Sequence, residues 1–273
     1  MQCQVCFHHC QLQEGQIGSC RARINKAGTI LPLNYGRIVS LALDPIEKKP
    51  LARFHPGSNI LSLGTFGCNM HCSFCQNYTL SQMGAEDLPS EYYSPTEIVT
   101  MAKGAKAQNN IGVAYTYNEP LVGYEFVRDT GKLVKEAGLV NVVVTNGCVA
   151  KPVLQEILPY IDAFNIDLKS FNPDFYKHMG GDLTMVKDFI SLAATKSHVE
   201  VTNLIIPGEN DGVEEMTALA QWLAKVNPDI TLHVTRFFPR YKMLDKKPTP
   251  EETVYKLAEV AYKYLPNVFT GNC

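Results

Sequence analysis

The sequence predicts an α/β fold built on a parallel sheet, and two observations support this prediction. Short apolar runs recur between residues 60 and 269 and alternate with longer amphipathic segments of helical character. This alternation is typical of parallel strands joined by right-handed helical crossovers. The chain has 273 residues, of which 45% are hydrophobic, so it can bury the core of one α/β barrel with a small appendage.

The first part of the chain, residues 1–58, is expected to form a cysteine-rich metal-binding segment with a linker. Residues 29–33 and 37–41 predict a short hairpin or sheet edge there. Prolines at positions 45, 50 and 56 then predict a linker, or a loop lying across the mouth of the barrel. The barrel itself is expected to occupy residues 59–273.

The barrel is expected to begin with a strand at residues 60–63. Later strands are expected at 111–115, 141–145, 163–167, 199–206, 232–235 and 268–269. Helices are expected to start at 94–97, 211–214 and 249–252, where a capping residue precedes an acid by three positions. Ligands of such barrels bind at the carboxyl ends of the strands, so polar residues at the strand ends are the candidates for a site.

Charge and cysteine content narrow the class of protein. With 25 Lys and Arg against 27 Asp and Glu, the chain has no excess of positive charge for a nucleic-acid partner. It contains no apolar run of about 18 residues, so we expect no membrane span and a cytoplasmic location. Nine cysteines in such a chain indicate metal or redox chemistry rather than disulfides.

Three cysteines follow the first barrel strand at C-x3-C-x2-C spacing: Cys68, Cys72 and Cys75. Three thiolates leave one iron of a four-iron cluster without a protein ligand. An open coordination position is typical of a metal centre that reacts. The alternative is a zinc knuckle completed by His71 or by a distant cysteine.

A second group of thiols lies near the N-terminus and has four members, which is enough to close a coordination shell. Structural zinc and an auxiliary iron-sulfur cluster both fit such a set, and free thiols in a flexible arm are the third alternative. A segment this small would gain stability from a metal. The four residues are Cys3, Cys6, Cys10 and Cys20.

The pattern C-x3-C-x-aromatic-C, with Phe74 as the aromatic residue, resembles the cluster loop of the radical S-adenosylmethionine (SAM) superfamily. This resemblance implies a partial (β/α)6 TIM-like barrel and a [4Fe-4S] cluster whose open iron is chelated by SAM. It also implies anaerobic, oxidoreductase-like chemistry in which one electron cleaves SAM to a 5'-deoxyadenosyl radical that abstracts hydrogen. A reductant such as ferredoxin or flavodoxin would supply the electron.

The resemblance also implies which strand-end residues bind SAM. Glu119 matches the acid of a Gly-Gly-Glu-Pro motif in related activases, and Asn118 beside it equally fits a helix cap. Asp167 and Lys169 match an Asp-Leu-Lys motif, with a simple ion pair as the alternative. His233 equally fits an ordinary core histidine. The candidates are Phe74, Asn118, Glu119, Thr145, Asn146, Asp167, Lys169, Asn203 and His233.

Motifs spread over most of the chain resemble one family more closely, the radical SAM enzyme of the AmmeMemoRadiSam system. They lie at 9–10, 15–23, 44–51 and 67–77. The family's substrate is unknown, and it is related to the activases of glycyl radical enzymes such as pyruvate formate-lyase. An activase acting on a glycine of a partner protein is one alternative, and a metal-stabilised binding module without enzymatic activity is another. The basic stretch 236–242 is either a solvated loop or a contact for an anionic substrate or a partner protein.

Overall fold

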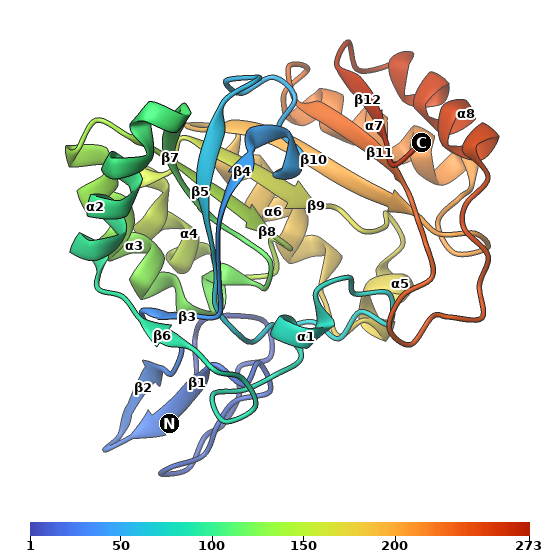
Figure 1. Ribbon diagram of the computed structural model, residues 1–273. Helices are drawn as coiled ribbons and strands as arrows, with labels where there is room; N and C mark the ends of the chain where they lie inside the picture. The colour runs from blue at the N-terminus through green and yellow to red at the C-terminus, as the bar shows by residue number, and fades with distance from the viewer.

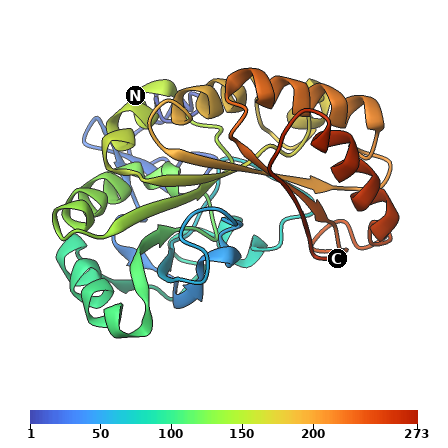
Figure 2. The same cartoon turned by 90° about the horizontal axis from the view of Figure 1, so that it is seen from above.

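The computed structural model describes residues 1–273 and confirms the α/β fold with a mostly parallel sheet (Figure 1). The main sheet has eight strands in the order β12-β11-β10-β9-β8-β7-β5-β4. All neighbours pair in parallel except β4, which runs antiparallel to β5. The sheet curves into an arc whose edges, β4 and β12, do not meet (Figure 2). It is therefore a partial barrel, as the sequence predicts.

The parallel strands lie within one or two residues of the expected positions. This agreement reflects the continuous apolar runs that strands need when a sheet is covered on both faces. The parallel strands are β5 (Asn59–Gly64), β7 (Asn110–Tyr115), β8 (Val140–Thr145), β9 (Ala163–Asp167), β10 (His198–Ile205), β11 (Thr231–Arg236) and β12 (Val268–Gly271). The antiparallel edge strand is β4 (Ser40–Pro45).

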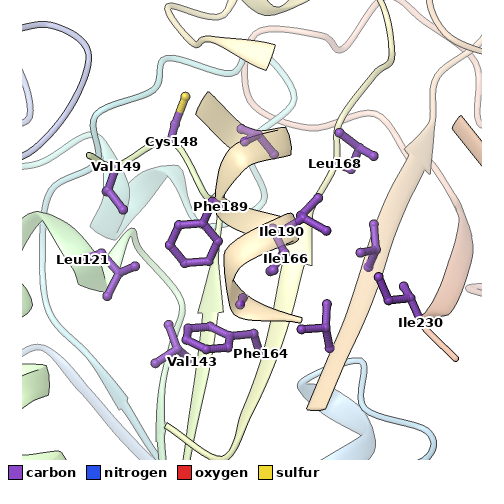
Figure 3. Close-up of a cluster of buried hydrophobic side chains, with 14 of the residues drawn as sticks. Leu121, Val143, Cys148, Val149, Phe164, Ile166, Leu168, Phe189, Ile190 and Ile230 are labelled. Carbon is purple, nitrogen blue, oxygen red and sulfur yellow. The ribbon is translucent and has the colours of Figure 1, made fainter. Parts of the chain in front are cut away.

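Helices cover the convex outer face of the arc (Figure 2). Figure 3 shows how α6 places Phe189 and Ile190 over Phe164 and Ile166 of β9. The Phe164 and Phe189 rings meet edge to face at 5.5 Å, which is a favourable aromatic geometry. The longer helices are α2 (Pro95–Gly104), α3 (Tyr124–Glu136), α4 (Lys151–Ile157), α6 (Leu183–Ala193), α7 (Val213–Val226) and α8 (Glu251–Tyr262).

Short helical elements complete the chain, and none of the helices is long and apolar enough to cross a bilayer. The short elements are α1 (Tyr78–Ser81), α5 (Pro173–His178), η1 (Ile46–Lys48), η2 (Ala105–Gln108), η3 (Pro120–Gly123) and η4 (Leu158–Tyr160).

One of the three expected helix caps is confirmed. Ser94 and Glu97 form a reciprocal capping box at the start of α2. The other two expected caps are wrong, because Gly212 and Pro250 occupy the N-cap positions of α7 and α8 without a side-chain bond. Thr249 instead donates its hydroxyl to the carbonyl of Ile205 at 2.6 Å, so it joins the start of α8 to β10.

The expected hairpin between residues 29–33 and 37–41 is also wrong. β2 (Thr29–Pro32) pairs with β1 (Arg23–Lys26), and β3 (Arg37–Ile38) pairs with β6 (Glu91–Tyr92). The cause is the two-residue turn Ala27-Gly28, whose φ angles of 51° and 74° suit a tight hairpin. Residues 40–45, which fall within the expected N-terminal segment, form β4 of the main sheet.

The proline-containing segment 46–54, here called the inner loop, does not lie across the barrel mouth. It packs on the concave face of the sheet, because Ile46 and Leu51 are apolar and fully buried against strand side chains. The side chain of Glu200 in β10 holds this loop, because it accepts hydrogen bonds from the amides of Ala52 (2.9 Å) and Arg53 (2.8 Å). The inner loop thus fills the interior of the partial barrel on the amino-terminal side of the parallel strands.

Candidate cluster and cofactor site

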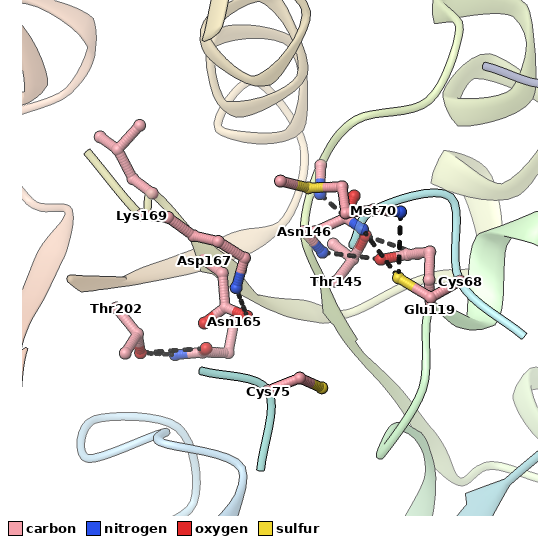
Figure 4. Close-up of polar contacts among 12 residues, drawn as sticks. Cys68, Met70, Cys75, Glu119, Thr145, Asn146, Asn165, Asp167, Lys169 and Thr202 are labelled. Carbon is pink, nitrogen blue, oxygen red and sulfur yellow. Dashed lines mark hydrogen bonds and ion pairs between the residues drawn. The ribbon is translucent and has the colours of Figure 1, made fainter. Parts of the chain in front are cut away.

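A cavity of about 470 Å³ is lined by residues of the inner loop, by the three candidate cluster cysteines and by residues of the strand ends. Its wall is made by the carboxyl ends of the parallel strands and by the loop that carries Cys68, Cys72 and Cys75. Figure 4 shows Glu119, Asn146 and Lys169, which follow β7, β8 and β9, near one another at this space. The location is the one expected for a ligand site in a parallel α/β fold.

The three cysteines of this loop, the cluster loop, all line the cavity. The amide of Met70 donates to Sγ of Cys68 at 3.4 Å, and Nδ2 of Asn146 does so at 3.6 Å. Burial raises the pKa of the Cys72 thiol to about 11, and burial together with Glu119 raises that of Cys68 well above its usual value. Buried thiols of this kind are held as thiolates only when a metal binds them.

The alternative of a zinc knuckle that includes His71 is not supported. The His71 ring is exposed, lies outside the cavity lining and contacts Gln82 at 3.2 Å. Three thiols facing one cavity, without a fourth protein ligand, suit a cluster with one open iron.

Glu119 is the most informative residue of the cavity. Its side chain accepts hydrogen bonds from the Thr145 hydroxyl (2.8 Å), the Asn146 amide (2.7 Å) and the Leu121 amide (3.0 Å). It is only 2% exposed, and no Lys, Arg or His side chain pairs with it. Burial therefore raises its pKa to about 7, although the three hydrogen bonds favour the charged form.

A buried carboxylate without a positive neighbour is costly, so such a group usually has a cationic partner. The thiols in the same cavity would be the ligands of a cluster. A cofactor that brings a positively charged or amino donor into this cavity would complete the environment of Glu119.

Asn118, by contrast, serves the backbone around it. Its Nδ2 donates to the carbonyls of Phe66 (3.1 Å) and Gly67 (2.9 Å), and its Oδ1 accepts from the Thr65 amide. The expectation that Asn118 caps a helix is wrong, since Glu119 is the N-cap of η3. Tyr117 has a φ of 72°, a left-handed conformation that glycine adopts without strain.

Asp167 and Lys169 both line the cavity and also pair with each other at 3.0 Å. Burial alone would lower the pKa of Lys169, but Asp167 and the Cys72 thiol outweigh it and raise that pKa. The Lys169 ammonium lies 5.9 Å from the ring of Phe74, another lining residue. The two readings of this pair, an ion pair and a pocket contact, are therefore compatible.

Two expected cofactor contacts do not reach the cavity. Asn203 lies on the opposite face of β10 from Thr202, which does line it, and donates to the Leu168 carbonyl at 2.7 Å. His233 is not among the residues that line the cavity, and its Nε2 contacts Glu200 at 2.6 Å. Both expectations are corrected: alternation along the strand excludes Asn203, and the contact with Glu200 engages His233 outside the cavity.

The inner loop and β4 add cavity residues to which the sequence pattern assigned no role. Asp44, Lys48 and Lys49 also line the cavity. Lys49 pairs with Asp44 at 2.8 Å, and Tyr117 donates its hydroxyl to the same carboxylate. Burial alone would raise the pKa of Asp44, but these donors hold it well below its usual range. In the sequence, only the run 44–51 drew attention to these residues, as part of the family resemblance, and it indicated no contact with a ligand.

The four N-terminal cysteines lie beside the cluster loop. Cys3, Cys6 and Cys20 are buried, and Cys10 is half-buried. Burial, with the neighbouring thiols, raises the pKa of Cys6 to about 12. Nowhere does the structure gather three His, Cys, Asp or Glu side chains into a site for a single metal ion.

This N-terminal segment packs directly on the cluster loop. His8 Nε2 contacts the Asn69 carbonyl at 2.8 Å, and a Cβ at Gly67 would lie 2.5 Å from the Cys20 carbonyl. Glycine is therefore required at position 67, where φ is 89°.

Comparison with known proteins assigns the family. Residues 62–223 match the Radical SAM superfamily. The chain is 40% identical to Uncharacterized protein MJ0808 of Methanocaldococcus jannaschii over all of this chain and 81% of that protein. It is 24% identical to Pyruvate formate-lyase 1-activating enzyme of Escherichia coli (strain K12), over 72% of this chain and 86% of that enzyme.

A solved structure shows the same fold. Streptococcus suis SuiB bound to S-adenosylmethionine superimposes with a TM-score of 0.62 at 14% identity, over 78% of this chain and 52% of SuiB. The match to the superfamily covers more than half of the chain, and it includes the cluster loop and the strand ends that line the cavity. The chain belongs to the radical SAM superfamily, and within it is similar to activating enzymes of pyruvate formate-lyase.

Proposed function

We propose that this protein is a radical SAM enzyme of the AmmeMemoRadiSam type, with a [4Fe-4S] cluster on Cys68, Cys72 and Cys75. The observation that carries the proposal is the buried Glu119 carboxylate, which has no cationic partner and shares a cavity with the three thiols. When bound, the cluster supplies one electron that cleaves SAM to methionine and a 5'-deoxyadenosyl radical.

The chain's own residues bind and orient the cofactor. Glu119 accepts a hydrogen bond from the SAM amino group, in a position fixed by the Thr145 hydroxyl and the Asn146 amide. Lys169 offers its ammonium to the polar groups of SAM while Asp167 keeps it charged. Buried Phe74 and the inner-loop residues Lys48, Lys49 and Pro50 line the cavity beside these groups.

The four N-terminal thiols are proposed to hold an auxiliary metal centre, either zinc or a second cluster. Three of them are buried, and Cys3, Cys10 and Cys20 lie near enough to Cys6 to affect its pKa. The structure does not bring three of them to ligand distance, so a bound metal would have to draw them together. Iron and zinc analysis of the wild type and of a variant with all four replaced by alanine distinguishes the two metals.

The main test is an anaerobic assay of the reconstituted protein with SAM and dithionite. We expect 5'-deoxyadenosine to form, and we expect Cys72→Ala to abolish both the product and the [4Fe-4S] absorbance. Cys273→Ala is the matched control, because Cys273 is exposed outside both thiol groups. Absence of 5'-deoxyadenosine from the wild type at full cluster occupancy would refute the proposal and favour a binding module.

A glycyl radical activase is the second candidate, because the identity to the pyruvate formate-lyase activating enzyme extends over 72% of this chain. The Tyr117-Asn118 pair in place of two glycines, and the cysteine-rich segment, stand against it. An organic radical signal in a partner protein after incubation with the enzyme, SAM and dithionite would favour the activase.

A further inference from the structure

We propose that the loop joining β11 to α8 is the docking site for a small acidic protein that delivers one electron to the cluster. The docking segment is residues 236–247. This inference rests on the proposed function and adds the place and chemistry of one partner. One electron leaves the reduced carrier and enters the oxidised cluster, and no bond forms or breaks.

The docking segment is attached to the cluster loop. The Lys242 amide donates to the Ser73 carbonyl at 2.9 Å, and Ser73 lies between two cluster-loop cysteines. The Tyr241 ring stacks on Tyr78 of α1 with centroids 4.6 Å apart. Figure 1 shows this segment descending from β11 toward α5 and α1. A protein bound to the segment would therefore also touch the cluster loop.

The cluster loop also reaches solvent at this place. Gln76 and Asn77 are exposed and line the cavity, and Cys75 before them is only partly buried. On the other side, Gly67 is covered by Cys20 and Ala22 of the N-terminal segment. Because electron transfer slows steeply with distance, the carrier needs to approach from the Cys75 side.

The charge of the docking segment specifies the partner. It holds five Lys and Arg and one acid, Asp245, in a chain whose net charge is -2. Arg236 and Lys246 pair with carboxylates on neighbouring elements. The other three basic residues are exposed and have no carboxylate partner: Arg240, Lys242 and Lys247. Unpaired exposed cations on one loop attract a surface rich in Asp and Glu.

The segment also has the apolar contacts that a specific interface needs. Phe238 is 39% exposed and Leu244 is 69% exposed. Apolar side chains surrounded by charged ones are typical of protein interfaces, where the apolar contacts give affinity and the charges guide approach.

The test compares two electron sources on the same reconstituted protein. The double variant Arg240→Glu and Lys242→Glu reverses two charges and leaves the Lys242 main-chain bond in place. Cluster reduction is followed in stopped flow with reduced flavodoxin, an acidic one-electron carrier, and separately with dithionite. Lys103→Glu with Lys106→Glu is the matched control, because both lysines are exposed on or just after α2, far from the cluster loop (Figure 1).

We expect the docking variant to be reduced by flavodoxin about tenfold more slowly at low salt, with a weaker salt dependence. Its reduction by dithionite, and its dithionite-driven cleavage of SAM, should match the wild type. The control variant should behave like the wild type with both reductants.

Three outcomes would overturn the inference: equal flavodoxin rates in the docking variant and the wild type, an equal loss in the control variant, or a parallel loss with dithionite. Failure of the proposed function would look different, because wild-type protein would then form no 5'-deoxyadenosine with dithionite even when its cluster is reduced.

Discussion

Replacing Glu119 with glutamine isolates the charge on which the cofactor assignment depends. The side chain keeps its size and can still accept from the Thr145 hydroxyl or the Asn146 amide. It loses the negative charge that would face the SAM amino group. We therefore expect SAM binding to weaken much more than folding.

The magnitude follows from the type of bond lost. A hydrogen bond that involves a charged group contributes about 1.5–3 kcal/mol, whereas a neutral one contributes about 1 kcal/mol. Since 1.4 kcal/mol corresponds to a factor of ten, loss of the charged bond should raise the Kd for SAM by about 10- to 150-fold. Isothermal titration of anaerobic protein, at equal [4Fe-4S] content, measures this change.

The pH dependence of SAM binding is a second measurement on the same variant. Burial raises the pKa of Glu119 to about 7 in the unliganded protein. A fall from pH 8 to pH 6 should therefore protonate this carboxyl and weaken SAM binding by up to about tenfold in the wild type. The glutamine variant should lack this part of the pH dependence, since it has no proton to gain.

A matched control exists elsewhere in the chain. Glu215 also accepts two short hydrogen bonds from neutral donors, the Ser170 hydroxyl and the Phe171 amide, but lies outside the cavity. Glu215→Gln should leave the Kd for SAM within about twofold of the wild type. A Glu119→Gln protein that binds SAM within threefold of the wild type at pH 8 would refute the assignment.

Three further variants test other parts of the structure. Asn118→Ala removes the side chain that joins the cluster loop to the end of β7, so we expect a loss of about 1–3 kcal/mol in urea unfolding and less iron per chain after reconstitution. Unchanged iron content would contradict that role. Glu200→Gln should lower the unfolding free energy at pH 7 by about 3 kcal/mol, because it weakens bonds to two histidines and to the inner loop. The pKa of folded Glu200 is lowered to about 2 from 4.5, since its hydrogen bonds outweigh burial, so this difference should persist above pH 4.5 and vanish toward pH 2. A pH-independent difference would show that the charge of Glu200 is not responsible. Replacing all four N-terminal cysteines with alanine should remove the auxiliary metal and lower the melting temperature, and an unchanged metal count would exclude a centre there.

The strand positions could be predicted from the sequence because parallel strands covered on both faces form apolar runs that stand out locally. The cluster loop was equally visible, since its spacing encodes its chemistry. The pairing of β1 with β2 depends on the tight turn at Ala27-Gly28, which the apolar pattern of residues 29–41 does not indicate.

Other features depend on tertiary position, which a single sequence does not show. Asn203 and Thr202 are neighbours in a strand, and only the register against β9 and β11 decides which of them faces inward. His233 is engaged by Glu200, which also holds the inner loop, and this tertiary contact is not visible in the sequence. Asp44 reaches the cavity only because β4 pairs with β5 in the antiparallel sense.

Asp44 and the inner loop illustrate one property of the fold: the first 58 residues form part of the site and are more than an attached segment. They supply β4, which forms one edge of the sheet, and the inner loop, which fills the interior of the partial barrel. They also supply the surface behind Gly67 against which the cluster loop is held. A barrel that lacked them would expose its apolar concave face and leave the Glu200 carboxylate without the Ala52 and Arg53 amides. Residues 44–50 and the barrel therefore build one cavity together, and the chemistry proposed for Cys68, Cys72 and Cys75 depends on both.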